Sequence, residues 1–390
     1  MNDAVITTVI RTPIGRAIKG ALKDTRPDDL AALVLREAVE RTPGLTPDMV
    51  DDVLVGNAHP EGEAGYNMAR IATQIAGFPD TMGAATINRF CASGLQTMVQ
   101  GVHSVALGMN NVVLAGGSDC SSRVPMGGHQ LAVNRELYKV KPEAYMPMGQ
   151  TAENVARKFG VSREEQDAMA LRSHENALRA REEGFFDSHV VPVHTRRKND
   201  NDEWEEITVT QDEGPRPGTT LEVLAGLRTV FADDEAATVT AGNSSPLNDG
   251  AAMSVVMNAD VAREIGAVPV ARLVQAAVAG VPPEIMGIGP VPAIRKLLKN
   301  VGMTVDDIDL FEINEAFAAQ AVYCQRELGI PVEKLNVNGG GIALGHPLGA
   351  TGTRIAADLF AEMHRRGAEF GVISMCIGGG QGMAALFQIA

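Results

Sequence analysis

Three short segments of the chain carry residues that could do nucleophilic and acid–base chemistry. The first is residues 88–96 (NRFCASGLQ), where small residues lead into an apolar pattern typical of a helix. Cys91 would then stand at a helix N-terminus, where the dipole and free N–H groups favour a thiolate and could also hold an oxyanion. We predict a nucleophilic cysteine whose pKa lies below the reference value of about 8.5. A buried structural cysteine is the alternative.

The second segment, residues 336–352 (NVNGGGIALGHPLGATG), holds a histidine inside a glycine-dense loop that opens a helix. So many glycines indicate a backbone that is pressed closely against something. A general base must be held in one orientation beside the reacting group, and tight turns around His346 would do that. We interpret His346 as a candidate base, with a structural histidine as the alternative.

The third segment, residues 374–382 (SMCIGGGQG), places Cys376 at the end of a strand and before a glycine turn. Two cysteines at strand-to-loop points suggest paired roles, in which one thiolate is the nucleophile and the other shuttles a proton. The remaining cysteines, Cys120 and Cys324, lie in apolar or helical contexts and are predicted to be packing residues.

The composition limits the class of protein. A chain of 390 residues is long enough for two or three domains, and 45% hydrophobic with 21% charged residues excludes a disordered chain or a coiled coil. The net charge of −14 argues against a nucleic-acid partner. Four cysteines without a C-x-x-C pair indicate a reducing compartment rather than a disulfide framework. The phosphate-binding and zinc-peptidase motifs are both missing.

The N-terminus enters a strand-like run at residues 4–10 without a basic segment, apolar core or cleavage site before it. No apolar stretch is long enough to span a membrane. We therefore expect a soluble, cytoplasmic protein with no integral membrane segment.

Short β-branched runs alternate with longer amphipathic stretches, which is the pattern of an α/β fold. Strands are expected at residues 53–55, 112–115 and 372–375, and a helix at 27–41. Residues 44–50 (GLTPDMV) reappear in outline as 302–308 (GMTVDDI), each copy between a helix and a strand. Two related α/β halves are predicted, with chance similarity as the alternative.

Residues 120–245 lack this alternation of short β-branched runs with amphipathic stretches, and they are predicted to form an inserted subdomain. Ser162 and Glu165 have the spacing of a capping box at the start of a long polar helix. Residues 198–206 are acid-rich around the only tryptophan and are interpreted as a solvated hairpin tip.

Together and in this order, the three segments resemble those of the thiolase family, over a span from residues 11–13 (RTP) to Gly382. The resemblance implies a five-layered αβαβα fold of two similar halves with an inserted loop domain. We expect the N-terminal half at residues 1–120 and 246–268, the loop domain at 121–245 and the C-terminal half at 269–390.

The resemblance also implies thiol-dependent cleavage of 3-ketoacyl-CoA, or the reverse Claisen condensation. Cys91 resembles the acylated nucleophile, His346 the base that activates it, and Cys376 the acid/base that serves the acetyl-CoA enolate. Asn314 matches the family's asparagine that holds a water, and this water and His346 bind the thioester oxygen. The N–H groups of Cys91 and Gly378 would form a second oxyanion hole. This ping-pong chemistry needs no metal or redox cofactor, and CoA is a substrate.

For CoA, the resemblance suggests Arg216 near the adenine-phosphate end and Ser245 near the pantetheine, with a merely solvated arginine as the alternative. Residues 147–150 (PMGQ) stand where thiolases that make acetoacetyl-CoA commonly read His-Met-Gly. The missing histidine resembles the degradative 3-ketoacyl-CoA thiolases of fatty-acid β-oxidation. We favour a degradative enzyme with broad chain-length tolerance, and an acetoacetyl-CoA thiolase (acetyl-CoA acetyltransferase) is the alternative.

Other classes are a catalytically silent thiolase-like binding protein, a decarboxylating condensing enzyme and a cysteine hydrolase. The intact set of candidate residues argues against the first, and the Cys376 segment argues against the second. The family assembles as dimers or dimers of dimers, so a homodimer or homotetramer is expected, with a strand edge of the first half as the contact. A subunit with the hydratase and dehydrogenase activities of β-oxidation is a further candidate partner.

Overall fold

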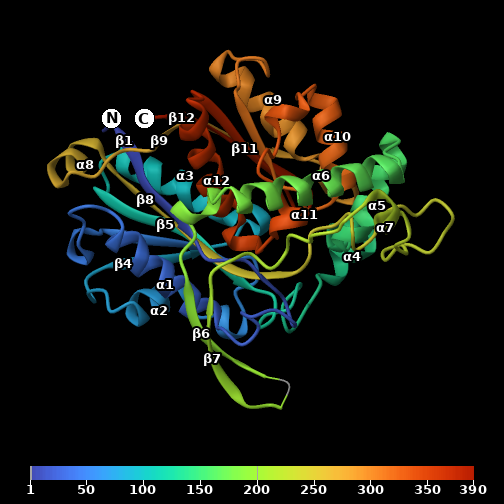
Figure 1. The fold of residues 1–390 in the computed structure, drawn as a ribbon. Helices are drawn as coiled ribbons and strands as arrows, with labels where there is room; N and C mark the ends of the chain where they lie inside the picture. Colours follow the sequence, from blue (N-terminus) through green and yellow to red (C-terminus); the bar gives the residue numbers. More distant parts are fainter. Residues whose placement is uncertain (1, 200) are drawn as a thin grey trace.

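The computed structural model describes residues 2–199 and 201–390 (Figure 1). Its large sheet contains β1 (Ala4–Arg11), β2 (Gly15–Arg16), β3 (Asp52–Gly56), β4 (Gly83–Ile87), β5 (Val112–Cys120), β8 (Asn248–Asn258), β9 (Ala271–Gly280), β10 (Leu310–Ile313), β11 (Phe370–Ile377) and β12 (Gln381–Ile389). The helices are α1 (Pro27–Glu40), α2 (Met68–Ile75), α3 (Ser93–Ala106), α4 (Arg135–Val140), α5 (Met148–Phe159), α6 (Arg163–Glu182), α7 (Leu221–Ala225), α8 (Ala259–Ile265), α9 (Pro290–Val301), α10 (Ala318–Leu328), α11 (Gly341–Leu344) and α12 (Thr351–Arg366). The strands and helices expected from the sequence are all present.

The large sheet consists of two sections, and the first four strands of one follow the same order as the four strands of the other. One section runs β1-β8-β5-β3-β4, and the other runs β9-β12-β11-β10. The residue pair Ile6 and Ala271 joins β1 to β9. In each section the third and fourth strands are parallel neighbours, β5 with β3 and β11 with β10, whereas the preceding pairs are antiparallel. The matching order confirms the prediction of two similar halves.

Side chains on neighbouring positions of a strand point to opposite faces, and this alternation builds the layers. On β5, Val112 and Leu114 pack with α1 and α2, whereas Val113 and Ala115 pack with α3 and α12. Strand β12 likewise packs against α3 and α12 with one face and against α9 and α10 with the other. Helices α3 and α12 therefore form a middle layer between the two sections. The result is the expected αβαβα arrangement.

The repeated segment found in the sequence occupies equivalent places in the two halves. Gly44 and Gly302 follow α1 and α9 with φ angles of 70° and 74°, a left-handed conformation that favours glycine. The strands that come next, β3 and β10, pair in parallel with β5 and β11. The sequence repeat is therefore also a structural repeat.

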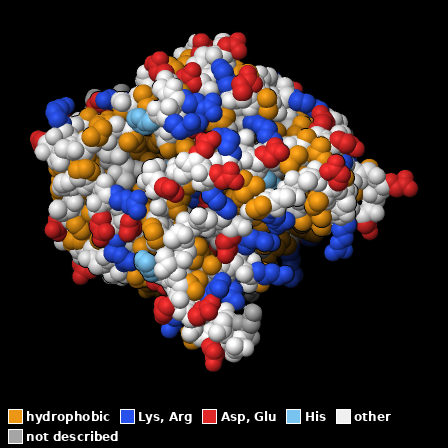
Figure 2. Space-filling view, viewed as in Figure 1, with side chains coloured by type: hydrophobic (Ala, Val, Ile, Leu, Met, Phe, Trp, Pro, Cys, Tyr) orange, Lys and Arg blue, Asp and Glu red, His pale blue; other side chains and the backbone are white. Residues whose placement is uncertain are grey.

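Between β5 and β8 the chain forms helices α4 to α7 and a hairpin of β6 (Val193–Lys198) and β7 (Trp204–Val209). Helix α6 begins at the predicted capping box, because Ser162 Oγ accepts the Glu165 N–H and the Glu165 carboxylate accepts the Ser162 N–H. The hairpin projects from the body at the lower edge of Figure 1. Figure 2 shows acidic and basic side chains interspersed over this face. No helix in the described ranges is long and apolar enough to cross a membrane.

Candidate active site

The candidate residues gather at the carboxyl ends of parallel strands. Cys91 follows β4, Asn314 follows β10, and Cys376 lies near the end of β11. Ligands of open α/β sheets bind in the crevice at this edge. The turn that contains Cys91 packs against both β11 and the turn that follows His346. The two halves therefore bring the three predicted reactive residues to one place.

Cys91 lies in a 3-10 turn, Phe90–Ala92, directly before α3, as predicted. Phe90 has a φ angle of +43°, a left-handed conformation that is strained for a bulky residue. Two hydrogen bonds hold the strained residue: its N–H donates to Asn88 Oδ1 at 2.8 Å, and Ser93 Oγ donates to its carbonyl oxygen at 2.7 Å. The turn thus fixes the direction of the Cys91 side chain.

The environment of the Cys91 thiol differs from the expectation. Burial raises the pKa of Cys91 to about 12, while hydrogen bonds from the N–H groups of Gly378 and of Cys91 itself act in the opposite direction. The prediction of a pKa below 8.5 is therefore wrong. Cys91 is only 6% exposed, and the loss of water around a charged sulfur outweighs the helix N-terminus. The resting group is a neutral thiol, which needs a base to become a nucleophile.

His346 is buried and held in one orientation. Its backbone N–H donates to Asn248 Oδ1 at 2.8 Å, and its Nδ1 lies 2.6 Å from Thr351 Oγ1. Within the described ranges, the other ring nitrogen, Nε2, is buried without a hydrogen-bond partner. Burial and the positive charge of Arg354 lower the pKa of His346 to about 3. A neutral imidazole in a fixed orientation has the properties that a general base requires.

The glycine-dense loop before α12 is closely packed, as predicted, and its partner is the first half. A Cβ atom at Gly349 would stand 2.6 Å from the carbonyl oxygen of Gly56. The Asp119 carboxylate accepts the Gly349 N–H from this loop and the Ala58 N–H, at 3.0 Å, from the first half. These contacts fix the loops of the two halves relative to each other.

Cys376 is fully buried in an apolar cluster. The cluster consists of Ala152, Val239, Met286, Ala316, Phe317 and the partly buried Met148. Burial raises the pKa of Cys376 well above its usual value, and the neighbouring Cys91 adds to the effect. Met148 Sδ also lies 3.5 Å from where a Cβ atom of Gly378 would stand. The residue that follows Pro147 therefore lies beside Cys376 and Gly378.

Asn314 presents an amide group without partners. The residue is 1% exposed, and neither its Oδ1 nor its Nδ2 atom has a hydrogen-bond partner among the described residues. Its backbone N–H donates to the Ser374 carbonyl oxygen at 2.9 Å, which holds it beside β11. Buried amides are normally hydrogen-bonded because desolvation is costly. The side chain is therefore available to a water or a substrate oxygen.

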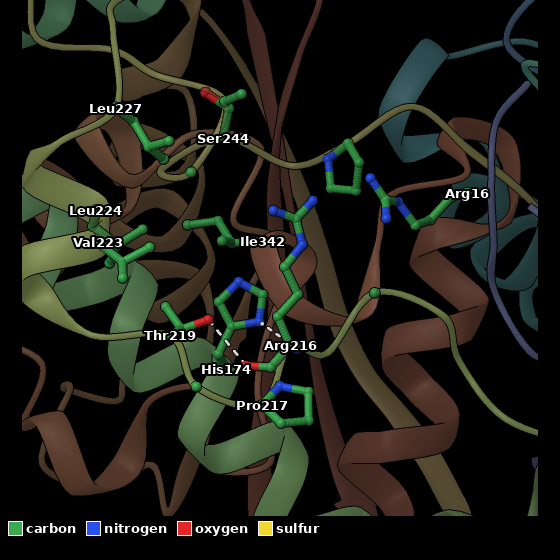
Figure 3. Close-up of a pocket in the computed structure, with 15 residues that line it drawn as sticks. Arg16, His174, Arg216, Pro217, Thr219, Val223, Leu224, Leu227, Ser244 and Ile342 are labelled. Atoms are coloured by element: carbon green, nitrogen blue, oxygen red, sulfur yellow. Dashed lines mark hydrogen bonds between the residues drawn. The ribbon is translucent and has the colours of Figure 1, made fainter. Parts of the chain in front are cut away.

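A cavity of ≈ 210 Å³ is lined by residues of the inserted segment and of both halves (Figure 3). Arg16 and Arg216 both line it, and its described lining holds no carboxylate. Burial and the charge of Arg16 lower the pKa of Arg216. The Arg216 N–H donates to His174 Nδ1 at 3.3 Å. Two guanidinium groups without a counter-charge suit a phosphate ligand.

The two predicted CoA residues lie in different surroundings. Arg216 lines the cavity, whereas Ser245 is half-buried next to it and donates its N–H to the Ala316 carbonyl oxygen at 2.9 Å. Ser244 lines the cavity and forms a β-bridge with Phe317, which belongs to the apolar cluster around Cys376. This bridge connects the cavity with the cysteines.

Sequence reasoning missed Arg16, Asp119, His174 and Thr351. Arg16 follows a Pro-x-Gly turn after β1, and Asp119 is the one charged residue of the buried strand β5, so both had a signal in the local sequence. Thr351 lies five residues after His346, within reach of the ring once a turn is formed. His174 had no local signal, because its partner Arg216 is 42 residues away.

The fold and site define an α/β protein of two similar halves, with two cysteines and a histidine where the halves meet. The family models described as "Thiolase, N-terminal domain" and "Thiolase, C-terminal domain" match residues 4–260 and 267–389. The chain belongs to the thiolase family.

Relatives match along the whole chain. The "3-ketoacyl-CoA thiolase" of Bacillus subtilis (strain 168) is 49% identical over 393 residues, 100% of each chain. The "3-ketoacyl-CoA thiolase B, peroxisomal" of Mus musculus is 47% identical over 389 residues, which cover 99% of this chain and 91% of the relative. The crystal structure of the Bacillus anthracis acetyl-CoA acetyltransferase matches with a TM-score of 0.91 and 44% identity, over 100% of this chain and 99% of the other.

Proposed function

We propose that the protein cleaves 3-ketoacyl-CoA with CoA to give acetyl-CoA and a shortened acyl-CoA, as in fatty-acid β-oxidation. One observation carries the proposal: the N–H groups of Cys91 and Gly378, from opposite halves, both reach the Cys91 sulfur beside a second buried thiol. Such a donor pair suits the oxyanion of an acyl group bound to that sulfur. The relatives named 3-ketoacyl-CoA thiolase support this reaction over the alternatives.

In the first step, Cys91 gives its proton to His346 Nε2, and its sulfur attacks the 3-keto carbon. The bond between C2 and C3 breaks, and the electron pair remains on the acetyl-CoA enolate. A water held by Asn314, together with His346, stabilises the enolate oxygen. Cys376 then protonates C2, so acetyl-CoA leaves and the acyl group stays on Cys91 as a thioester.

In the second step, the Cys376 thiolate takes the proton from the thiol of CoA. The CoA sulfur attacks the acyl carbonyl, whose oxyanion is stabilised by the N–H groups of Cys91 and Gly378. Cys91 leaves and recovers its proton from His346. The cycle closes with all three groups neutral, which agrees with the pKa directions of buried Cys91, His346 and Cys376.

For CoA, we propose that Arg216, with Arg16, binds a phosphate and that Ser245 lies along the pantetheine. The reaction consumes CoA as a substrate and uses no metal or other cofactor. The N-terminal half comprises residues 1–120 and 246–268, the loop domain 121–245 and the C-terminal half 269–390.

The proposed assembly is a homodimer or homotetramer in the cytoplasm. Strand β4 supports it, because this strand ends the order of the large sheet and leaves an edge for a second copy. A subunit with hydratase and dehydrogenase activities would supply the 3-ketoacyl-CoA, and we propose it as a candidate partner.

The decisive experiment is CoA-dependent cleavage of a 3-ketoacyl-CoA series, from acetoacetyl-CoA upward, by the wild type and Cys91→Ser. Cleavage well beyond four carbons that the variant loses supports the degradative reaction. Activity confined to acetoacetyl-CoA points to the alternative that the Bacillus anthracis structure's name suggests, an acetyl-CoA acetyltransferase. No cleavage at any length contradicts both.

A further inference from the structure

We infer that Thr351 is a positioning residue for this reaction: its hydroxyl fixes the tautomer and orientation of His346, which leaves Nε2 free to take a proton. The inference deepens the proposed function and rests on His346 as its base. The Thr351 hydroxyl bonds to His346 and Pro347 and does not line the cavity, so it acts through the imidazole.

The hydrogen-bond pattern permits one placement of the hydrogens. Thr351 Oγ1 lies 2.8 Å from the Pro347 carbonyl oxygen and 2.6 Å from His346 Nδ1. A hydroxyl has one hydrogen to donate, and a carbonyl oxygen can only accept. The hydroxyl must therefore donate to Pro347, because two oxygens at that distance without a hydrogen between them would repel each other. Nδ1 must then carry the hydrogen that Oγ1 accepts, and in a neutral imidazole Nε2 holds the lone pair.

The described surroundings of Thr351 offer His346 Nδ1 no replacement for the threonine hydroxyl. Thr351 is fully buried, so water does not replace the hydroxyl if it is removed. The Pro347 carbonyl oxygen also accepts the Ala350 N–H at 2.9 Å, so it keeps a partner without the threonine. Without the hydroxyl, the imidazole loses the acceptor of its Nδ1–H group. A buried N–H group without a hydrogen-bond partner costs free energy.

An isosteric Thr351→Val substitution therefore shifts the balance between the two tautomers. The tautomer with hydrogen on Nε2 has no unpaired N–H group at Nδ1, so the substitution favours it. In that tautomer, Nε2 cannot accept the Cys91 proton. We expect kcat to fall on the order of 10²- to 10⁴-fold, the range that a general base contributes. We expect KM for acetoacetyl-CoA to stay within about twofold, because the Thr351 hydroxyl is used by His346 and Pro347 and does not line the cavity.

Three variants test the inference. Thr351→Ser keeps the hydroxyl and is expected to retain kcat within a few-fold. Thr73→Val is the matched control, since Thr73 is also fully buried in a helix and its hydroxyl donates to its own helix, at Arg70 O, 2.8 Å away. Thr351→Val is also expected to slow alkylation of Cys91 by iodoacetamide, a reaction that needs no CoA substrate. Full activity of Thr351→Val, or an equal loss in Thr351→Ser, overturns the inference.

A second measurement works even if Thr351→Val fails to fold. Wild-type protein labelled with ¹⁵N-histidine reports which ring nitrogen carries hydrogen, and a His346→Asn variant assigns the signal. We expect a protonated Nδ1 and an unprotonated Nε2 at neutral pH. Hydrogen on Nε2, as the Nε2–H tautomer or as imidazolium, overturns the inference. A wild type that shows no thiolysis but has the expected tautomer would instead overturn the proposed function.

Discussion

Gly349, in the loop after His346, packs its backbone against Gly117 on β5 so closely that Gly117 could carry no side chain. The contact is made at the carboxyl end of the first sheet section, where the two halves meet. Close packing of backbone on backbone leaves little room for adjustment. The relative position of Cys91 and His346 therefore depends on residues that themselves do no chemistry.

The first prediction is that Gly349→Ala lowers the free energy of unfolding by about 1–3 kcal/mol, the usual cost of overpacking, and also reduces thiolysis. The added methyl group would stand 2.6 Å from both Gly56 O and Asp119 Oδ2. Gly280→Ala is the control, because its added Cβ would meet no described residue within 4 Å other than its two chain neighbours. Urea unfolding of the three proteins measures the difference, and equal stability of the two variants would contradict the tight contact.

The second prediction concerns the resting state of the site. Burial raises the pKa of Cys91 to about 12 and lowers that of His346 to about 3, so at pH 7 both groups are neutral. We expect no thiolate absorbance at pH 7 beyond that of Cys91→Ser, and alkylation that accelerates steadily as the pH rises. A thiolate signal at pH 7 that Cys91→Ser abolishes would show a thiolate–imidazolium pair instead.

The sequence predicted the fold well because its signals are local. The repeat of residues 44–50 in 302–308 reflects two helix-turn-strand units, and these units fold as the pattern indicates. The pairing of Ile6 with Ala271, which joins the two sections into one sheet, has no local signal. Such contacts between distant residues follow only from the packing of whole layers.

The sequence predicted which residues meet, but not their electrostatics. Cys91 stands before a helix as expected, yet the sign of its pKa shift depends on how deeply the turn is buried. Burial comes from Leu348 and Ala58, which lie on other loops. A helix N-terminus can be predicted from a short segment, whereas desolvation requires the assembled site.

The third prediction is a pH dependence of stability. Burial raises the pKa of Asp119 to about 7, so between pH 4 and 7 the folded protein holds a proton that the unfolded chain releases. The free energy of unfolding then falls as pH rises through this range, by at most about 1.4 kcal/mol per pH unit. In Asp119→Asn, the free energy of unfolding should fall less steeply as the pH rises. Burial also raises the pKa of Asp249, to about 6. Asp249 therefore adds a smaller fall of the free energy of unfolding with pH, and this part is the same in the wild type and in Asp119→Asn.

Urea unfolding at pH 5 and pH 7.5 provides the measurement. The wild type is expected to lose more stability between these values than Asp119→Asn does. An identical loss in both proteins would mean that the proton is not held at Asp119.

The fourth prediction concerns CoA. Arg16 and Arg216 line one cavity, and no carboxylate is among its described lining residues. An anionic phosphate would therefore relieve the repulsion between the two arginines. Arg216→Ala should raise KM for CoA about tenfold or more, since a charge-assisted hydrogen bond contributes about 1.5–3 kcal/mol. Thiolysis with pantetheine, which lacks the nucleotide, should be unaffected. Arg263→Ala, on exposed α8, is the control; an equal effect on CoA and pantetheine would place Arg216 elsewhere.

The last prediction separates function from stability at Asn314. Its two amide atoms are buried without a hydrogen-bond partner among the described residues, so Asn314→Ala removes a polar group whose burial costs free energy. We expect thiolysis to fall at least about a hundredfold, as for loss of an oxyanion donor, while urea unfolding shows no loss of stability. Asn336→Ala is the contrast, because the Asn336 amide bonds to Ile313 and Glu315 and its loss should cost about 1–3 kcal/mol. If Asn314→Ala were as destabilising as Asn336→Ala, the Asn314 side chain would stabilise the fold, and its proposed role in binding a water would be contradicted.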